Sequence, residues 1–94
     1  MAIKVSPRVR DKIENKHGLT IAEVHEAISG RLGKFLKDQR EEHKSDPPTL
    51  WFIGSTDFGK AVKVAFIFKD GHMIIRTAYI ANAKELEIYN NYAM

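Results

Sequence analysis

Residues 49–80 read TLWFIGS-TDFG-KAVKVAFIF-KDGH-MIIRTAYI. Three apolar runs, rich in Val, Ile, Phe and Trp, are separated by two short segments that each contain aspartate and glycine. This arrangement predicts a meander of three antiparallel strands. The second turn, Asp70-Gly71, favours type I′, in which both central residues adopt positive φ. The rest of the chain must cover this sheet.

The middle run, residues 60–68, is expected to be the central strand. Alternation places Val62, Val64, Phe66 and Phe68 on one face and Ala61, Lys63, Ala65 and Ile67 on the other. Both faces are largely apolar, which is typical of a strand that is covered on two sides. Lys63 is the exception, and its long side chain can reach toward an edge of the sheet.

Two helix starts precede the meander. Ser6 and Pro7 suit the N-cap and first helical position of one helix. Thr20 and Glu23 have the spacing of a capping box for a second helix. Gly18 is a suitable residue just beyond the end of the first helix. Two helices joined by so tight a corner form an αα-hairpin, which we expect at the N-terminus.

The segments between these elements are less regular. Ile3-Lys4-Val5 alternates and is either an edge strand or an extended lead-in. Residues 31–38 leave helix and strand open, and we favour a strand over residues 34–37. Residues 39–48 are polar and end in two prolines, so we expect a loop there.

A C-terminal helix completes the predicted fold. Asn82 and Glu85 resemble another capping box, and Leu86 and Tyr89 are spaced to pack on the sheet. The elements together predict one α+β domain over residues 1–94. It has an N-terminal αα-hairpin, an antiparallel sheet of three to four strands that includes the meander, and a C-terminal helix.

Size and composition limit the classes of protein. The 94 residues suffice for one modest core. Because the chain has no cysteine, disulfides and thiolate metal sites are excluded. No apolar run reaches the roughly 18 residues of a membrane span, and the N-terminus lacks the hydrophobic segment of a signal peptide. We therefore expect a cytoplasmic protein that has no membrane partner.

The charge of the chain is mildly basic. There are 15 Lys and Arg residues against 12 Asp and Glu residues, a formal net charge of +3. This excess permits nucleic-acid binding without requiring it. Residues 1–16 are locally basic, and we interpret them as an arm and a helix with a solvated face.

The motifs of several enzyme classes do not occur in the sequence. It contains no P-loop, no Gly-x-Gly-x-x-Gly, no His-Glu-x-x-His and no Gly-x-Ser-x-Gly. We therefore expect neither a cofactor nor a metal. The polar residues that occur suit metal-free phosphodiester chemistry on RNA, which needs a base for the 2′-OH, an acid for the leaving oxygen and cations over the phosphate.

Six residues are candidates for this chemistry. The predicted loop carries Arg40, Glu41 and His43, which offer a guanidinium for phosphate and groups that act as base or acid. Arg76 on the last strand is a second phosphate-binding candidate. Tyr79 on the same strand can stack on a base, and Lys63 on the neighbouring strand is a further substrate-binding candidate.

Each candidate also has a purely structural explanation. The loop from Arg40 to His43 can simply be a solvated turn. Arg76 can be a buried cation paired with a carboxylate of the final helix. Tyr79 can belong to the rim of the core. His17, beside a helix end, is more often a capping or packing histidine than a base.

The sequence also resembles a known family. The matching segments are Asn15-Lys16-His17-Gly18-Leu19-Thr20, Glu23-Val24, Gly54-Ser55-Thr56, Gly59-Lys60, Ile74-Ile75-Arg76-Thr77-Ala78, and Glu85 with Tyr89. They resemble BrnT-type toxins, small bacterial ribonucleases of the RelE/ParE-like superfamily. The resemblance implies a RelE/BrnT-like fold, an endoribonuclease of the mRNA-interferase type, and a small antitoxin encoded nearby. Tyr79 stands where these toxins usually carry arginine.

A second similarity covers the middle of the chain. Residues 35–53, from Phe35-Leu36 to Trp51-Phe52-Ile53, resemble short bacterial proteins often labelled ADP-ribosyl-dinitrogen reductase hydrolase. Enzymes that hydrolyse ADP-ribose linkages are much larger helical proteins with acidic magnesium sites, for which this chain lacks the length and the carboxylate clusters. The proteins of this group carry Tyr or Phe at the position of Tyr79, so this residue fits their pattern.

Two main hypotheses for function follow, beside a third, a small hydrolase of ADP-ribose linkages, which the length and the carboxylate content of the chain disfavour. The first is a toxin-like, metal-independent endoribonuclease that acts on RNA and is neutralised by a small antitoxin. The alternative is a non-catalytic module that uses the same fold to bind a protein or nucleic acid. A homodimer is compatible with either hypothesis.

Overall fold

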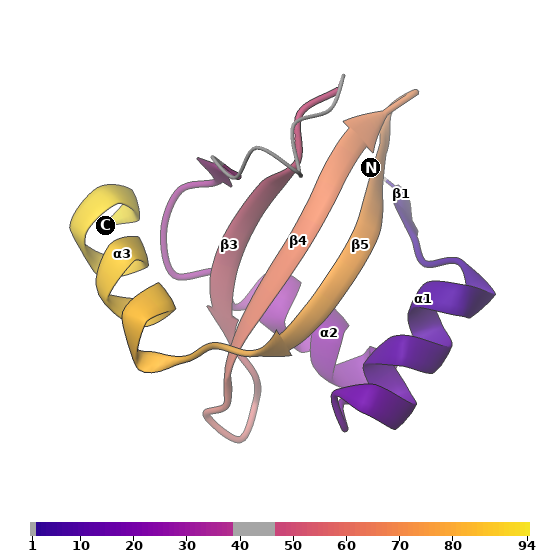
Figure 1. Cartoon of the computed structure of the whole chain (residues 1–94), viewed down its shortest axis with the longest axis horizontal. Coiled ribbons are helices and arrows are strands. Elements are labelled where there is room, and N and C mark those ends of the chain that lie inside the picture. The colour runs from indigo at the N-terminus through magenta and orange to yellow at the C-terminus, as the bar shows by residue number, and fades with distance from the viewer. Residues whose placement is uncertain (1, 39–46) are drawn as a thin grey trace.

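A five-stranded sheet forms the centre of the computed structural model, which describes residues 2–38 and 47–94 (Figure 1). The strands are β1 (Ala2–Lys4), β2 (Leu36–Lys37), β3 (Leu50–Ser55), β4 (Ala61–Lys69) and β5 (His72–Ile80). The helices are α1 (Pro7–Asp11), the π-helical turn η1 (Lys12–Lys16), α2 (Ile21–Ser29) and α3 (Ala83–Ala93). The order of strands across the sheet is β1-β5-β4-β3-β2.

The predicted meander is confirmed. β3, β4 and β5 pair antiparallel in chain order, and β4 is the central strand of the sheet. Asp70 and Gly71 have φ angles of 54° and 77°, which suits a tight hairpin turn with two left-handed residues. Residues 62–66 of β4 are all buried, as the apolar pattern on both faces predicted.

The edges of the sheet differ from the prediction of three to four antiparallel strands. β1 pairs with β5 in parallel, with Ile3 opposite Met73. β2 is confirmed as a strand, but it is limited to Leu36–Lys37 and pairs with β3. The sheet is therefore five-stranded and mixed. An alternating tripeptide indicates an extended segment but not its partner. The chain between β1 and β5 runs through α1, η1, α2 and strands β2 to β4, so the connection is long enough for a parallel pairing.

The helix α2 packs on one face of the sheet, against β3 and β4 (Figure 1). Val24 and Ala27 of this helix are buried, and so are Phe52 and Phe66 of the sheet. Gly54 in β3 permits the close approach, because a Cβ at this position would collide with the backbone carbonyl of Ala27. These contacts build the main core of the domain.

The predicted N-terminal caps are confirmed. The Oγ of Ser6 accepts a hydrogen bond from the N–H of Val9 at 3.2 Å. Thr20 and Glu23 exchange the two bonds of a capping box, each 3.0 Å long. The first helix continues from α1 into η1, which directs the fully buried Ile13 toward the core.

The helix α3 packs beside β2 and β3 (Figure 1). Tyr89 is 2% exposed, and its hydroxyl donates a hydrogen bond to the carbonyl of Lys34 at 2.8 Å. The prediction for Leu86 is wrong, since this side chain is 38% exposed. The first turn of α3 instead directs the carboxylate of Glu85 toward the sheet. No helix in residues 2–38 and 47–94 is long and apolar enough to cross a membrane.

Candidate functional site

Arg76 occupies an irregular position in β5. Ala65 of β4 lies opposite Thr77, and the next residue, Phe66, lies opposite Ile75, so Arg76 is an extra residue without a partner in β4. Such a bulge redirects side chains, and bulges are frequent beside functional sites. Arg76 is exposed. The interpretation of Arg76 as a buried cation paired with the final helix is therefore wrong, because the bulge breaks the alternation on which it was based.

Arg76 faces basic residues of the N-terminal helical segment. A groove of about 470 Å³ lies along this side of β5. It is lined by Ser6, Arg8, Val9, Lys12, Ile74, Ile75 and Arg76, and we call it the cationic groove. Arg8 and Lys12 are four residues apart, so they share one face of the helical segment. Two elements far apart in sequence thus bring three cations to one groove.

The charges in the cationic groove are not neutralised by the described part of the chain. The ion pairs between described residues are Lys60–Glu23 and Lys63–Glu85, and neither includes Arg8, Lys12 or Arg76. An adjoining hollow of about 550 Å³ shares Ser6 and Ile74 with the groove and adds Lys4 and Arg10 to the basic surface. A concave surface with unpaired guanidinium and ammonium groups attracts phosphate.

Lys63 and Tyr79 lie together in a different environment. The Oε2 of Glu85 accepts a hydrogen bond from Lys63 Nζ at 2.9 Å and another from the Tyr79 hydroxyl at 2.7 Å. The Oε1 of the same carboxylate accepts from the backbone N–H of Asn82 at 3.0 Å, as part of the capping box of α3. We call Lys63, Tyr79 and Glu85 the Glu85 network. Because its partners lie on β4, β5 and α3, it ties the start of α3 to the sheet.

The charged and polar groups of the Glu85 network have hydrogen-bond partners within the protein. Burial acts to raise the pKa of Glu85, but hydrogen bonds from Asn82, Lys63 and Tyr79 outweigh it, so this pKa is lowered. Burial and the hydrogen bond to Glu85 raise the pKa of Tyr79. The ammonium of Lys63 also lies 4.6 Å from the centre of the Trp51 ring. These contacts give Lys63 and Tyr79 structural roles, and their assignment to substrate stays a prediction.

His17 lies between the two regions. Its ring centre is 5.4 Å from that of Tyr79, so the expected packing role is confirmed. Burial lowers the pKa of His17, and the charges of Lys12 and Lys16 lower it further. Its Nε2 is buried and has no hydrogen-bond partner. Burial and the charges of Lys12 and Lys16 thus disfavour the charged imidazole near the end of the helical segment that carries Arg8 and Lys12.

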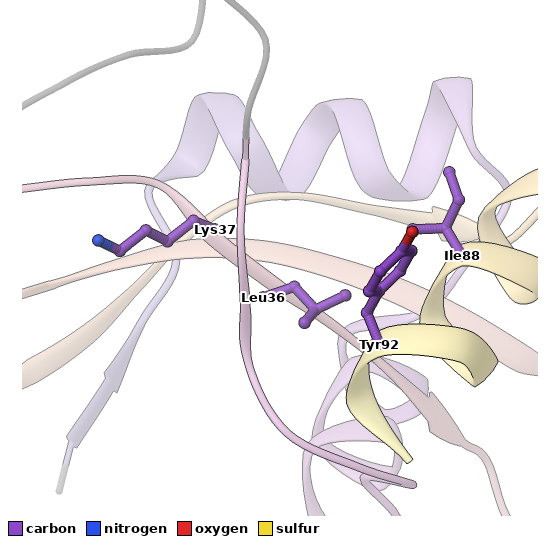
Figure 2. A pocket seen from close by; sticks show the side chains of 4 residues that line it. All are labelled: Leu36, Lys37, Ile88 and Tyr92. Carbon is purple, nitrogen blue, oxygen red and sulfur yellow. The ribbon is translucent and has the colours of Figure 1, made fainter.

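A third region of the surface is mostly apolar. A hollow of about 460 Å³ between β2 and α3 has Leu36, Lys37, Ile88 and Tyr92 in its lining. Figure 2 shows Leu36 and Tyr92 pointing toward one another, whereas Lys37 points away from them. Its described lining offers one cation, so the cationic groove is the better candidate for an anionic ligand.

The structure brings together only part of the predicted site. Arg40, Glu41 and His43 lie outside the described residues. Lys63 and Tyr79 meet at Glu85, and neither lines the cationic groove with Arg76. The sequence prediction overlooked Arg8 and Lys12, which it treated as part of a solvated helix face. Their four-residue spacing was visible in the sequence, but the bulge that brings Arg76 to them was not.

The described residues contain no group of three or more His, Cys, Asp or Glu side chains that could hold a metal ion. No protein-family model matches the sequence, and no curated protein matches it either. The function must therefore be argued from the geometry of the site.

Proposed function

We propose that this domain binds RNA in the cationic groove and acts as a toxin-like, metal-independent endoribonuclease in the cytoplasm. The observation that carries the proposal is the convergence of Arg8, Lys12 and Arg76, unpaired with any described residue, on one groove. Cations arranged in this way bind the phosphate backbone, and the bulge leaves Arg76 exposed beside the groove. The fold would then be of the RelE/BrnT-like type, with its αα-hairpin supplying two of the three cations.

Cleavage of RNA requires groups beyond those that hold the phosphate. In the proposed reaction a base removes the proton of a 2′-OH, the oxygen attacks the adjacent phosphorus, and an acid protonates the leaving 5′-oxygen. This displacement leaves a 2′,3′-cyclic phosphate and needs no metal. Glu41 and His43 are the sequence candidates for base and acid, and Arg40 would join Arg76 at the phosphate. A small antitoxin would block this activity.

A direct assay tests binding and cleavage together. A fluorescently labelled single-stranded RNA is incubated with the protein in excess EDTA, and anisotropy and denaturing gels are recorded. We expect binding that weakens with salt, and products that end in a cyclic phosphate. Arg76→Glu should weaken binding roughly tenfold or more, because it both removes and reverses one phosphate contact. Lys84→Glu, an exposed charge reversal on α3, is the matched control and should bind as the parent does.

One observation favours the alternative of a non-catalytic binding module. The described lining of the cationic groove holds cations but neither a carboxylate nor an imidazole. A binding module would retain salt-dependent, Arg76-dependent affinity and yield no cyclic phosphate. Expression in bacteria separates the hypotheses further. The endoribonuclease should arrest growth, and Arg40→Ala or His43→Ala should relieve the arrest while the protein still binds RNA. RNA affinity that Arg76→Glu leaves unchanged would contradict both the endoribonuclease that binds RNA in the cationic groove and a module that binds nucleic acid there.

A further inference from the structure

The turn between β3 and β4 presents an aromatic side chain to solvent. Phe58 is 95% exposed, the highest value among the large apolar residues that are exposed. Figure 1 shows this turn projecting beyond the ends of β3 and β4. A phenyl ring in water forgoes the free energy of apolar burial, which is typically about 1.5–3 kcal/mol for such a side chain.

The turn that carries Phe58 is held by many hydrogen bonds. Within residues 56–60, the Thr56 N–H donates to the Lys60 carbonyl at 3.0 Å, and the Gly59 N–H donates to the Thr56 carbonyl at 2.9 Å. The Lys60 N–H donates to the Thr56 hydroxyl at 3.0 Å. Gly59 has a φ of 84°, which glycine adopts without strain. We call residues 56–60 the Phe58 turn.

The helix α2 fixes the Phe58 turn from outside. The N–H of Asp57 donates to Glu26 Oε1 at 3.0 Å, and Lys60 forms an ion pair with Glu23 at 2.6 Å. The ring is thus presented by a rigid support rather than by a loose loop. A turn whose backbone is ordered before binding loses little backbone entropy on contact, and aromatic anchors that enter a pocket often contribute much of the affinity of an interface.

The charges around Phe58 indicate the kind of partner. Asp57, Glu23 and Glu26 contribute three negative charges near the turn, and Lys60 contributes one positive charge. An acidic neighbourhood repels the phosphates of RNA, so stacking of Phe58 on a base is disfavoured. A fitting surface would have an apolar wall for the ring and a basic rim for the acids.

The cationic groove of the same chain has both properties. The half-buried Val9 and Ile74 provide apolar walls, and Arg8, Lys12 and Arg76 provide the rim. Its volume of about 470 Å³ lies within the range of roughly 300–1,000 Å³ that is usual for pockets of small ligands. Figure 1 shows the Phe58 turn beyond the ends of β3 and β4, whereas α1 lies at the β5 side of the sheet near β1.

We propose that the Phe58 turn of one copy inserts into the cationic groove of a second copy. The contact is heterologous, since each molecule offers one turn and one groove, and it leads to a closed ring or an open chain of subunits. It would also cover Arg8, Lys12 and Arg76, so that self-association competes with any anion for the groove. The proposal does not depend on RNA binding.

A complementation experiment tests this contact. The masses of the full chain, Phe58→Ala and Arg76→Glu are measured by sedimentation velocity over a range of concentrations and salt. We expect concentration-dependent association of the parent that high salt weakens. Each variant alone should associate at least roughly tenfold more weakly, since it lacks either the aromatic anchor or one cation of the groove, which becomes an anion. An equimolar mixture of the two variants should form a 1:1 complex, because the turn of Arg76→Glu still fits the groove of Phe58→Ala.

The controls keep the test decisive. Both side chains are exposed, so the variants should unfold like the parent, and Lys12→Glu replaces Arg76→Glu if the latter does not fold. Lys84→Glu should associate like the parent. A parent that is monomeric throughout, variants that associate normally, or a mixture that stays monomeric would each overturn the proposal. So would a Phe58→Ala variant that loses RNA affinity but associates normally, since the ring would then contact nucleic acid.

Discussion

The Glu85 network and the cationic groove both take residues from β5, yet they use charge in opposite ways. Tyr79 donates to Glu85, Lys63 pairs with it, and the carboxylate also caps α3. Arg76, three residues before Tyr79, projects from a bulge toward Arg8 and Lys12 and has no counter-charge among the described residues. Polar groups that satisfy one another hold the fold together, whereas like charges that gather without a partner leave a place for a ligand.

The difference matters because charge type alone does not reveal it. Lys63, Arg76 and Tyr79 are equally plausible as substrate-binding residues in the sequence. Only the positions of Glu85 and Lys12 distinguish them. If this contrast is correct, changes in the network should cost stability, and changes in the groove should cost binding.

The largest effect is expected from Glu85→Ala. It removes the partner of Lys63, which is 8% exposed, and half of a capping box. Breaking a buried ion pair costs about 3–5 kcal/mol, which we reduce to about 2–4 kcal/mol for the remaining exposure of this pair. Urea denaturation should show this loss in the free energy of unfolding. Glu87→Ala, an exposed change on the same helix, should alter it by less than about 0.5 kcal/mol.

The contrast would fail if Glu85→Ala left stability unchanged and abolished RNA binding by the folded protein. Glu85 would then be a ligand-binding group whose contacts in the free protein are incidental.

Neutralising the groove should give the next largest effect. The double variant Arg8→Gln/Lys12→Gln removes two of the three cations on the rim. We expect roughly tenfold weaker binding to single-stranded RNA. The slope of log K against the logarithm of the salt concentration should also become shallower by about 0.7 for each lost phosphate contact. Anisotropy titrations at several salt concentrations measure both. The control variant Lys84→Gln/Lys69→Gln changes two other exposed lysines. If it bound RNA as weakly as the groove variant, net charge and not the groove would determine affinity.

Much of the fold could be predicted because its signals are local. The caps at Ser6, Thr20 and Asn82 and the turn at Asp70-Gly71 depend on neighbouring residues, and all four are present. Pairing of consecutive strands by short turns is likewise a local event. The parallel pairing of β1 with β5 depends on how the helices pack, and no pattern of residues encodes it directly.

The site was harder to predict for the same reason. The bulge at Arg76 shifts its side chain out of the alternation, and a strand pattern contains no sign of it. Glu85 was recognised as a capping residue, but its second oxygen reaches two strands that are distant in sequence. Charges acquire a role through the partners that they meet across elements, so residue type alone does not determine their function.

A smaller effect is expected from Tyr79→Phe. This change removes the 2.7 Å hydrogen bond to Glu85 and keeps the ring against His17. Glu85 retains Lys63 and Asn82 as donors, so the cost should be about 1 kcal/mol in the free energy of unfolding. RNA affinity should not change if Tyr79 belongs to the network. A tenfold loss of affinity at unchanged stability would instead place Tyr79 at the substrate, as the sequence predicted.

The smallest effect concerns His17, which connects the two regions. Burial and the charges of Lys12 and Lys16 lower its pKa below the ordinary value of 6.5. Just below pH 6.5 the unfolded chain therefore binds a proton at His17 more readily than the folded protein does. The contribution of His17 to the free energy of unfolding is therefore fully present above pH 6.5. It is lost as the pH falls from 6.5 to the lower pKa of the folded state. His17→Gln should remove the pH dependence of the free energy of unfolding in this range. The separate loss of stability below pH 4.5, the ordinary pKa of Glu85, should remain. Lys12→Gln should raise the pKa of His17, as followed by the NMR shifts of its ring protons, because it removes one of the neighbouring charges. A pKa of His17 that Lys12→Gln leaves unchanged would mean that Lys12 of the cationic groove has no electrostatic effect on His17.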